Sequence, residues 1–163
     1  MSRGEIISES AVRFARTLPA APEKVWAFLT NGALLPEWYG DGTIEAREGG
    51  AVTLMGGHIR GVVTGWRPQK FLAYTWSVFQ PGEDVSAWPI SYVEFALEDA
   101  GAATALTLTH RPIPEPMHKL TLLGWHTMLD MIAQGLDGNF PHRTEMMPKS
   151  AAVYGVDLNA LKR

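Results

Sequence analysis

Cysteine is absent from all 163 residues of this sequence. Without thiols the chain can form no disulfide and no thiolate zinc site, and thiol redox chemistry is excluded. A chain without cysteine is typical of reducing compartments, so we expect a cytoplasmic protein.

Long apolar runs are also missing. The most apolar stretch, residues 120–136, is interrupted by Gly124, His126, Asp130 and Gln134, whereas a bilayer span needs about 18 apolar residues or more. Residues 1–10 lack the apolar segment of a secretory signal. We therefore expect a soluble chain that is neither exported nor inserted into a membrane.

A strong excess of charge of one sign is lacking too. The formal net charge is -3, and the lysines and arginines are scattered along the chain. Such a distribution gives no general attraction to phosphate backbones, so we do not expect nucleic acid as a partner.

The composition that is present, 46% hydrophobic and 19% charged, is that of a globular protein. A chain of this length can bury one core without disulfides. We expect a single domain over residues 11–138. The remaining residues, 139–163, are interpreted as a tail without a second domain, in which residues 149–154 can be read as a short helix.

The first third of the sequence predicts one strand followed by two short helices. Residues 11–18 alternate apolar and polar side chains, a pattern that only Arg16 breaks. Pro22 then suits the first position of a helix that extends to about residue 29. Residues 33–38 predict one further helical turn, which delivers Trp38 and Tyr39 into a loop.

The central part of the sequence predicts an antiparallel sheet, because runs of β-branched and aromatic residues alternate between short turns. The expected strands are residues 43–47, 52–57, 60–67, 71–78, 90–98 and 104–110. On three of them the alternation places one set of side chains on a common inner face: Leu72, Tyr74 and Trp76; Val93, Phe95 and Leu97; and Leu106, Leu108 and His110.

A long helix follows, from about residue 117 to residue 138. Along it the residues spaced three and four apart form one apolar stripe, consisting of Leu122, Trp125, Leu129, Ile132 and Leu136. A helix of about 20 residues is about 30 Å long. It can therefore cross the whole sheet and lie in its concave face.

This order of elements resembles the START-like, or SRPBCC, superfamily. Narrower motifs resemble its bacterial branch related to activators of the Hsp90 ATPase, and they are residues 22–26, Trp38, Glu48-Gly49-Gly50, Gly61-Val62-Val63, residues 72–76 and 104–110, and Gly124-Trp125. The resemblance implies an α+β helix-grip fold, in which a curved antiparallel sheet of about seven strands wraps around a long C-terminal helix, with two short helices after the first strand.

The same resemblance implies a cavity between sheet and helix, and it leaves three functions open. The first is binding of a small hydrophobic or aromatic ligand. The second is a polyketide cyclase or dehydratase-like activity, and the third is regulation of a chaperone ATPase. A shared fold does not choose among these.

Aromatic and apolar residues on the inner faces are the candidates for lining the cavity, because aromatic rings give large, stiff contact areas and methionine adapts to irregular shapes. They are Trp38, Tyr39, His58, Tyr74, Trp76, Phe95, Leu108, His110, Trp125, Met128 and Leu129. For each of them, ordinary core packing is the alternative.

Catalytic groups are few. His110 and Tyr74 could transfer protons in a cyclase-like reaction, since neutral imidazole can both donate and accept. The alternative for His110 is a satisfied, partly buried histidine at the end of a strand. No Gly-x-Ser-x-Gly motif is present. No complete catalytic constellation is visible, which favours a protein that is not an enzyme.

Metal and cofactor sites are not expected. His118 and His126 are eight residues apart, about 12 Å along a helix, which is too far to bind one ion. Gly49-Gly50 and Gly56-Gly57 lack the Lys-Ser or Lys-Thr ending of a phosphate loop. A homodimer, with Trp88 and the tail in its interface, is one interpretation of the exposed aromatic.

Overall fold

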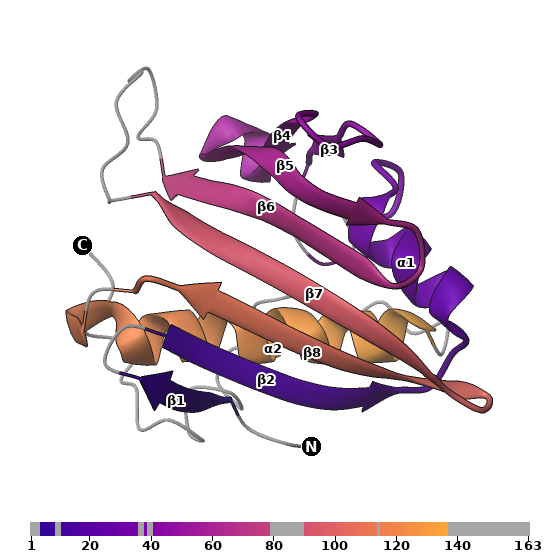
Figure 1. Ribbon diagram of the computed structural model, residues 1–163. Coiled ribbons are helices and arrows are strands. Elements are labelled where there is room, and N and C mark those ends of the chain that lie inside the picture. The colour runs from indigo at the N-terminus through magenta and orange to yellow at the C-terminus, as the bar shows by residue number, and fades with distance from the viewer. Residues whose placement is uncertain are drawn as a thin grey trace.

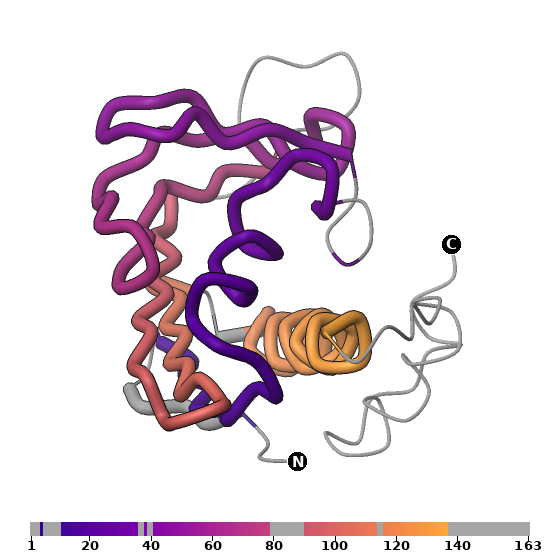
Figure 2. The backbone as a smooth tube through the Cα atoms, turned by 90° about the vertical axis from the view of Figure 1, so that its right-hand side faces the viewer, coloured from indigo at the N-terminus to yellow at the C-terminus, as the bar shows by residue number. Residues whose placement is uncertain are grey.

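One curved sheet holds the fold together. The computed structural model describes residues 4–8, 11–35, 38, 41–78, 90–113 and 115–136. Within them, eight strands pair antiparallel in the order β1-β2-β8-β7-β6-β5-β4-β3. The helices α1 (Pro22–Thr30) and α2 (His118–Leu136) lie inside its curve (Figures 1 and 2). The predicted α+β helix-grip class is confirmed.

The strand bounds mostly match the sequence pattern. The strands are β1 (Glu5–Ser8), β2 (Ala11–Leu18), β3 (Thr43–Ile44), β4 (Ala51–Leu54), β5 (Ile59–Arg67), β6 (Phe71–Val78), β7 (Ser91–Ala100) and β8 (Ala103–Arg111). β3 is shorter than predicted because the chain turns between Glu45 and Gly50, where the N–H of Arg47 bonds the carbonyl of Glu45 and the N–H of Gly50 bonds the carbonyl of Arg47. β4 ends early because Gly56 and Gly57 adopt positive φ angles of 66° and 100°, which are incompatible with a strand.

β1 was not predicted, and it raises the number of strands from about seven to eight. Its sequence, Glu-Ile-Ile-Ser, has no period-two alternation. It forms a strand by pairing with β2, where Ile6 lies opposite Val12. A short edge strand of this kind depends on its neighbour rather than on its own pattern.

The inner faces are arranged as the alternation predicted. The three residues named above on β7 and those on β8 are buried, as are Leu72 and Tyr74 on β6, whereas Trp76 is half-buried. The five residues of the α2 stripe are buried against them and complete one hydrophobic core. The apolar face of the sheet thus packs against the apolar face of α2.

The helical segment after β2 is confirmed in its first part. Pro22 stands at the first turn of α1, where its missing N–H costs nothing. After α1 the carbonyl of Asn31 accepts bonds from the N–H groups of Leu34 and Leu35, which closes one more turn. The indole of Trp38 donates to the carbonyl of Phe28 at 2.7 Å and ties this turn back to α1. Residues 36, 37, 39 and 40 of the predicted second helix and its loop lie outside the described residues.

Three other sequence predictions fall outside the described residues: the loop with Trp88, the last two residues of the predicted long helix (137 and 138) and the tail over residues 139–163. In the part of the chain that is described, no helix is both long and apolar enough to cross a membrane.

Candidate functional site

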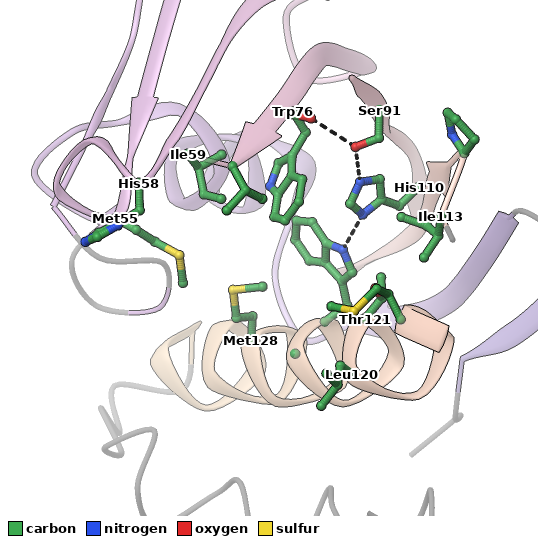
Figure 3. Close-up of a pocket in the computed structure, with 15 residues that line it drawn as sticks. Met55, His58, Ile59, Trp76, Ser91, His110, Ile113, Leu120, Thr121 and Met128 are labelled. Atoms are coloured by element: carbon green, nitrogen blue, oxygen red, sulfur yellow. Dashed lines mark hydrogen bonds between the residues drawn. The ribbon is translucent and has the colours of Figure 1, made fainter. Parts of the chain in front are cut away.

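A pocket with a volume of about 370 Å³ opens between the sheet and the first half of α2 (Figure 3). One wall comes from the turn after β4 and from β5 to β8, and the other comes from α2 and the segment before it. Its described lining consists of Met55, His58, Ile59, Trp76, Val78, Ser91, His110, Pro112, Ile113, Met117, Leu120, Thr121, Gly124, Trp125 and Met128. Most of these side chains are apolar, and His58, Ser91, His110 and Thr121 are the polar ones among them.

The helix wall is a second stripe along α2. Thr121, Gly124 and Met128 follow one another at spacings of three and four, so they lie on one face. Trp125 belongs both to this face and to the core stripe. A Cβ added to Gly124 would meet no atom within 4 Å. The missing side chain at Gly124 therefore leaves room between helix and sheet.

The pocket is lined on the sheet side by a chain of hydrogen bonds through His110. The indole Nε1 of Trp125 donates to Nδ1 of His110 at 3.0 Å. The other ring nitrogen, Nε2, lies 2.7 Å from the hydroxyl of Ser91, and that hydroxyl donates to the carbonyl of Trp76 at 3.0 Å. Figure 3 shows Trp76, Ser91 and His110 in line above the helix.

The hydrogen-bond donors around His110 determine its tautomer. An indole N–H can only donate, so Nδ1 must carry a lone pair. The proton of the neutral ring is then on Nε2 and is donated to Ser91, whose own proton goes to Trp76. Burial lowers the pKa of His110 from 6.5 to about 3, because water no longer solvates the charged form. His110 is thus a neutral ring with both nitrogens engaged inside the protein.

The structure brings five of the sequence-predicted site residues into this pocket: His58, Trp76, His110, Trp125 and Met128. Met55 extends from the sheet side and Met128 rises from α2 (Figure 3). His58 stands at the rim and is exposed.

Five further predicted site residues do not line it. The side chains of Trp38, Tyr74, Phe95, Leu108 and Leu129 are buried in the core, and the rings of Tyr74 and Phe95 pack at 6.1 Å between centroids. Tyr39 lies outside the described residues.

Several lining residues were missed by sequence reasoning. Thr121 and Gly124 had a usable signal, because with Met117 and Met128 they repeat at helical spacing beside the stripe that was recognised. Ser91 had none. It reaches His110 because β7 pairs with β8, and the pattern of the two strands does not give the register of that pairing.

The helix is anchored beneath the pocket by charged groups. Arg16 on β2, whose side chain is 2% exposed, bonds Asp130 on α2 at 2.6 Å. The ring of His126 lies 3.4 Å from the other oxygen of the same carboxylate. Burial alone would raise the pKa of Asp130, but the hydrogen bonds and charges of His126 and Arg16 lower it below its usual 3.8. The charge of Arg16, which broke the strand pattern, is therefore compensated.

The remaining helix histidine also has a structural partner. Nε2 of His118 donates to the carbonyl of Ile113 at 3.0 Å and holds the approach to α2 against its first turn. Among the residues the structure describes, no three His, Asp or Glu side chains are grouped to hold a metal ion.

Residues 19–137 match the family described as Activator of Hsp90 ATPase homolog 1-like protein. No curated protein is similar enough to count as a sequence relative.

Several solved structures share the fold. CalU16 from Micromonospora echinospora is 23% identical, with a TM-score of 0.71 over 89% of this chain and 86% of its own. Protein MLL2253 from Mesorhizobium loti is 24% identical, with a TM-score of 0.67 over 78% of this chain and 96% of its own. DynU16, described as a protein in the dynemicin biosynthetic locus, is 22% identical, with a TM-score of 0.66 over 80% of this chain and 49% of its own.

Proposed function

This chain belongs to the Activator of Hsp90 ATPase homolog 1-like family, and we propose that it binds a small hydrophobic, aromatic ligand in the pocket between its sheet and α2. The family match confirms the START-like resemblance that the sequence motifs indicated. The ligand is an inference from the pocket itself.

The observation that carries this proposal is a mostly apolar pocket of about 370 Å³ between the sheet and α2. Protein interiors rarely leave room for more than a water molecule, whereas pockets for small molecules begin at about 300 Å³. The two indoles of Trp76 and Trp125 offer flat faces for an aromatic ring, and Met55 and Met128 supply adaptable thioethers.

A cyclase-like activity is the second candidate, which the START-like resemblance leaves open. Proton transfer requires a group that reaches the substrate with a free proton or lone pair. Both nitrogens of His110 are engaged within the protein, and Tyr74 is not among the lining residues. The geometry therefore favours binding over catalysis.

Chaperone regulation is the third candidate and rests on the family description. It would act through an external surface rather than through the pocket. Stimulation of ATP hydrolysis by a purified Hsp90-type chaperone on addition of this protein would establish it, and that assay is independent of any ligand.

The binding proposal is tested by closing the pocket at Gly124. Gly124→Leu places a branched side chain in the hollow, whereas Gly124→Ala adds a single methyl where no atom lies within 4 Å. We expect naphthalene to quench tryptophan emission and raise the melting temperature of the wild type and of Gly124→Ala, but not of Gly124→Leu.

If naphthalene and larger aromatic hydrocarbons leave the wild-type emission and melting temperature unchanged, the pocket does not bind aromatic ligands. Equal binding by all three proteins would place the ligand elsewhere. Far-ultraviolet circular dichroism of Gly124→Leu verifies that the variant remains folded.

A further inference from the structure

Three polar groups of the pocket wall form their hydrogen bonds within the protein rather than towards the pocket. Three of its N–H and O–H groups could have met an anionic ligand: the indole of Trp125, Nε2 of His110 and the hydroxyl of Ser91. Each instead donates within the protein, to Nδ1 of His110, to Ser91 and to the carbonyl of Trp76, respectively. These three groups therefore present no free donor to a ligand.

Charge is missing from the lining as well. Among the described residues around the pocket there is no Lys, Arg, Asp or Glu. The buried Arg16 does not line the pocket, and its guanidinium bonds Asp130. His58 is the other titratable group of the lining, and it stands exposed at the rim, where water competes for any ion that it meets.

One hydroxyl differs from the other polar groups. Thr121 lies half-buried on the pocket face of α2, and it makes no side-chain hydrogen bond with any described residue. Thr127, on the same helix, by contrast donates its hydroxyl proton back to the carbonyl of Leu123 at 2.9 Å. The hydroxyl of Thr121 can therefore both donate and accept towards a ligand.

Building on the proposed function, we infer that the pocket selects an uncharged aromatic ligand with a hydrogen-bonding group that meets Thr121, and rejects carboxylates of the same shape. An ionised carboxylate loses its water on entering an apolar site and needs paired donors in return. The donors of Trp125, His110 and Ser91 are committed within the protein and do not pair with a carboxylate. A neutral ester, ketone or phenol needs a single partner, and Thr121 supplies it.

Methyl naphthoate and naphthoate are the matched probes, since they share one ring system and differ in charge at neutral pH. We expect the ester to bind at least about tenfold more tightly than the acid, by tryptophan quenching and calorimetry, which is the factor produced by about 1.4 kcal/mol. Equal affinities, or a preference for the acid, would overturn the inference while leaving the pocket as a binding site. If neither probe nor naphthalene binds, the proposed function itself fails.

A charge placed at Thr121 tests the position. Thr121→Lys brings an ammonium to the pocket wall, and Thr121→Met is its uncharged control of similar length. We expect Thr121→Lys to bind naphthoate more tightly than the ester. Thr121→Met, which loses the hydroxyl, should bind the ester more weakly than the wild type and gain no affinity for naphthoate. An unchanged preference in Thr121→Lys would mean that the ligand does not reach this residue.

A second position keeps the test decisive if Thr121→Lys does not fold. Met117 lines the pocket four residues before Thr121 and is half-buried. Met117→Lys therefore brings a charge to the same wall, from a position where the lysine side chain also extends towards solvent. It should move the preference in the same direction.

Discussion

The indole nitrogen of Trp125 donates its hydrogen bond to Nδ1 of His110 at 3.0 Å, across the boundary between α2 and β8. The two rings meet edge to face, with centroids 6.0 Å apart. The bond joins helix to sheet at the pocket wall. It also requires a lone pair on Nδ1, so the imidazole is held neutral.

The neutral imidazole predicts a pH dependence of stability. In the unfolded chain His110 takes up a proton near 6.5, whereas in the folded protein it stays neutral down to about 3. The unfolded state then binds more protons between these values, so the free energy of unfolding falls as the pH drops through that window, by up to about 1.4 kcal/mol per pH unit. Urea unfolding of the wild type and His110→Gln measures this contribution.

The Gln variant is the control because its amide can accept from Trp125 and donate to Ser91 without titrating. We expect its free energy of unfolding to fall less steeply with decreasing pH than that of the wild type. The difference between the two slopes should correspond to the uptake of about one proton on unfolding. Identical slopes for the two proteins would contradict a neutral, buried His110.

Replacement of Trp125 by Phe should act on both the stability and the titration of His110. The change leaves Nδ1 buried without its donor, which costs about 1–3 kcal/mol. A proton on Nδ1 would no longer face an indole N–H, so the pKa of His110 should rise from about 3. Histidine NMR titration and urea unfolding measure the two effects.

Trp66→Phe serves as the matched control for Trp125→Phe. Trp66 is half-buried and packs against Trp26 at 5.1 Å between centroids, away from the pocket lining. It should leave the titration of His110 unchanged. If the pKa of His110 is equally low in Trp125→Phe, burial alone accounts for it.

The ion pair between Arg16 and Asp130 should be strongly stabilising when measured by removal of one partner. Arg16→Met leaves the Asp130 carboxylate part-buried beside His126 and should cost about 3–5 kcal/mol. Arg47→Met breaks the exposed pair with Glu45 and should cost less than about 1 kcal/mol. Chemical denaturation of the two variants compares them.

The double variant Arg16→Met, Asp130→Leu separates charge from packing. Because it removes both buried charges, we expect it to recover much of the stability lost in Arg16→Met. A double variant no more stable than the single one would mean that packing around the arginine stem, rather than the charge left on Asp130, causes the loss.

The same substitution should have opposite effects at two glycines. Gly124→Ala adds a methyl into open space within α2 and should stabilise the protein by up to about 1 kcal/mol, since alanine favours the helix. Gly61→Ala drives a Cβ into the carbonyl of Thr75 on the neighbouring strand and should destabilise it by about 1–3 kcal/mol. Thermal unfolding of both variants shows whether each substitution stabilises or destabilises the protein. A loss of stability in Gly124→Ala would contradict the open space beside Gly124.

Much of the fold was predictable because its signals are local. Alternation along β6, β7 and β8 identified their inner faces, and the spacing of Leu122 and its partners identified the core face of α2. β1 escaped prediction for the same reason, since Glu-Ile-Ile-Ser has no alternation and forms a strand only beside β2.

The pocket was only partly predictable. Trp76, His110 and Trp125 were named from the sequence and line it, whereas Tyr74 and Leu108, on the same strands, pack in the core. An inner-face position is common to the cavity and to the core, and periodicity cannot separate them. The distinction depends on how far α2 lies from each position along a strand.

The sequence by itself therefore determined which faces are apolar, that one long helix must be buried against a sheet, and that no cysteine chemistry occurs. Only the tertiary structure decided what the polar residues do. Arg16 meets Asp130 across 114 residues of chain, and His110 receives its proton donor from α2 and its acceptor from β7. Apolar periodicity is a property of neighbours along the chain, whereas a hydrogen bond requires a partner that folding brings within reach.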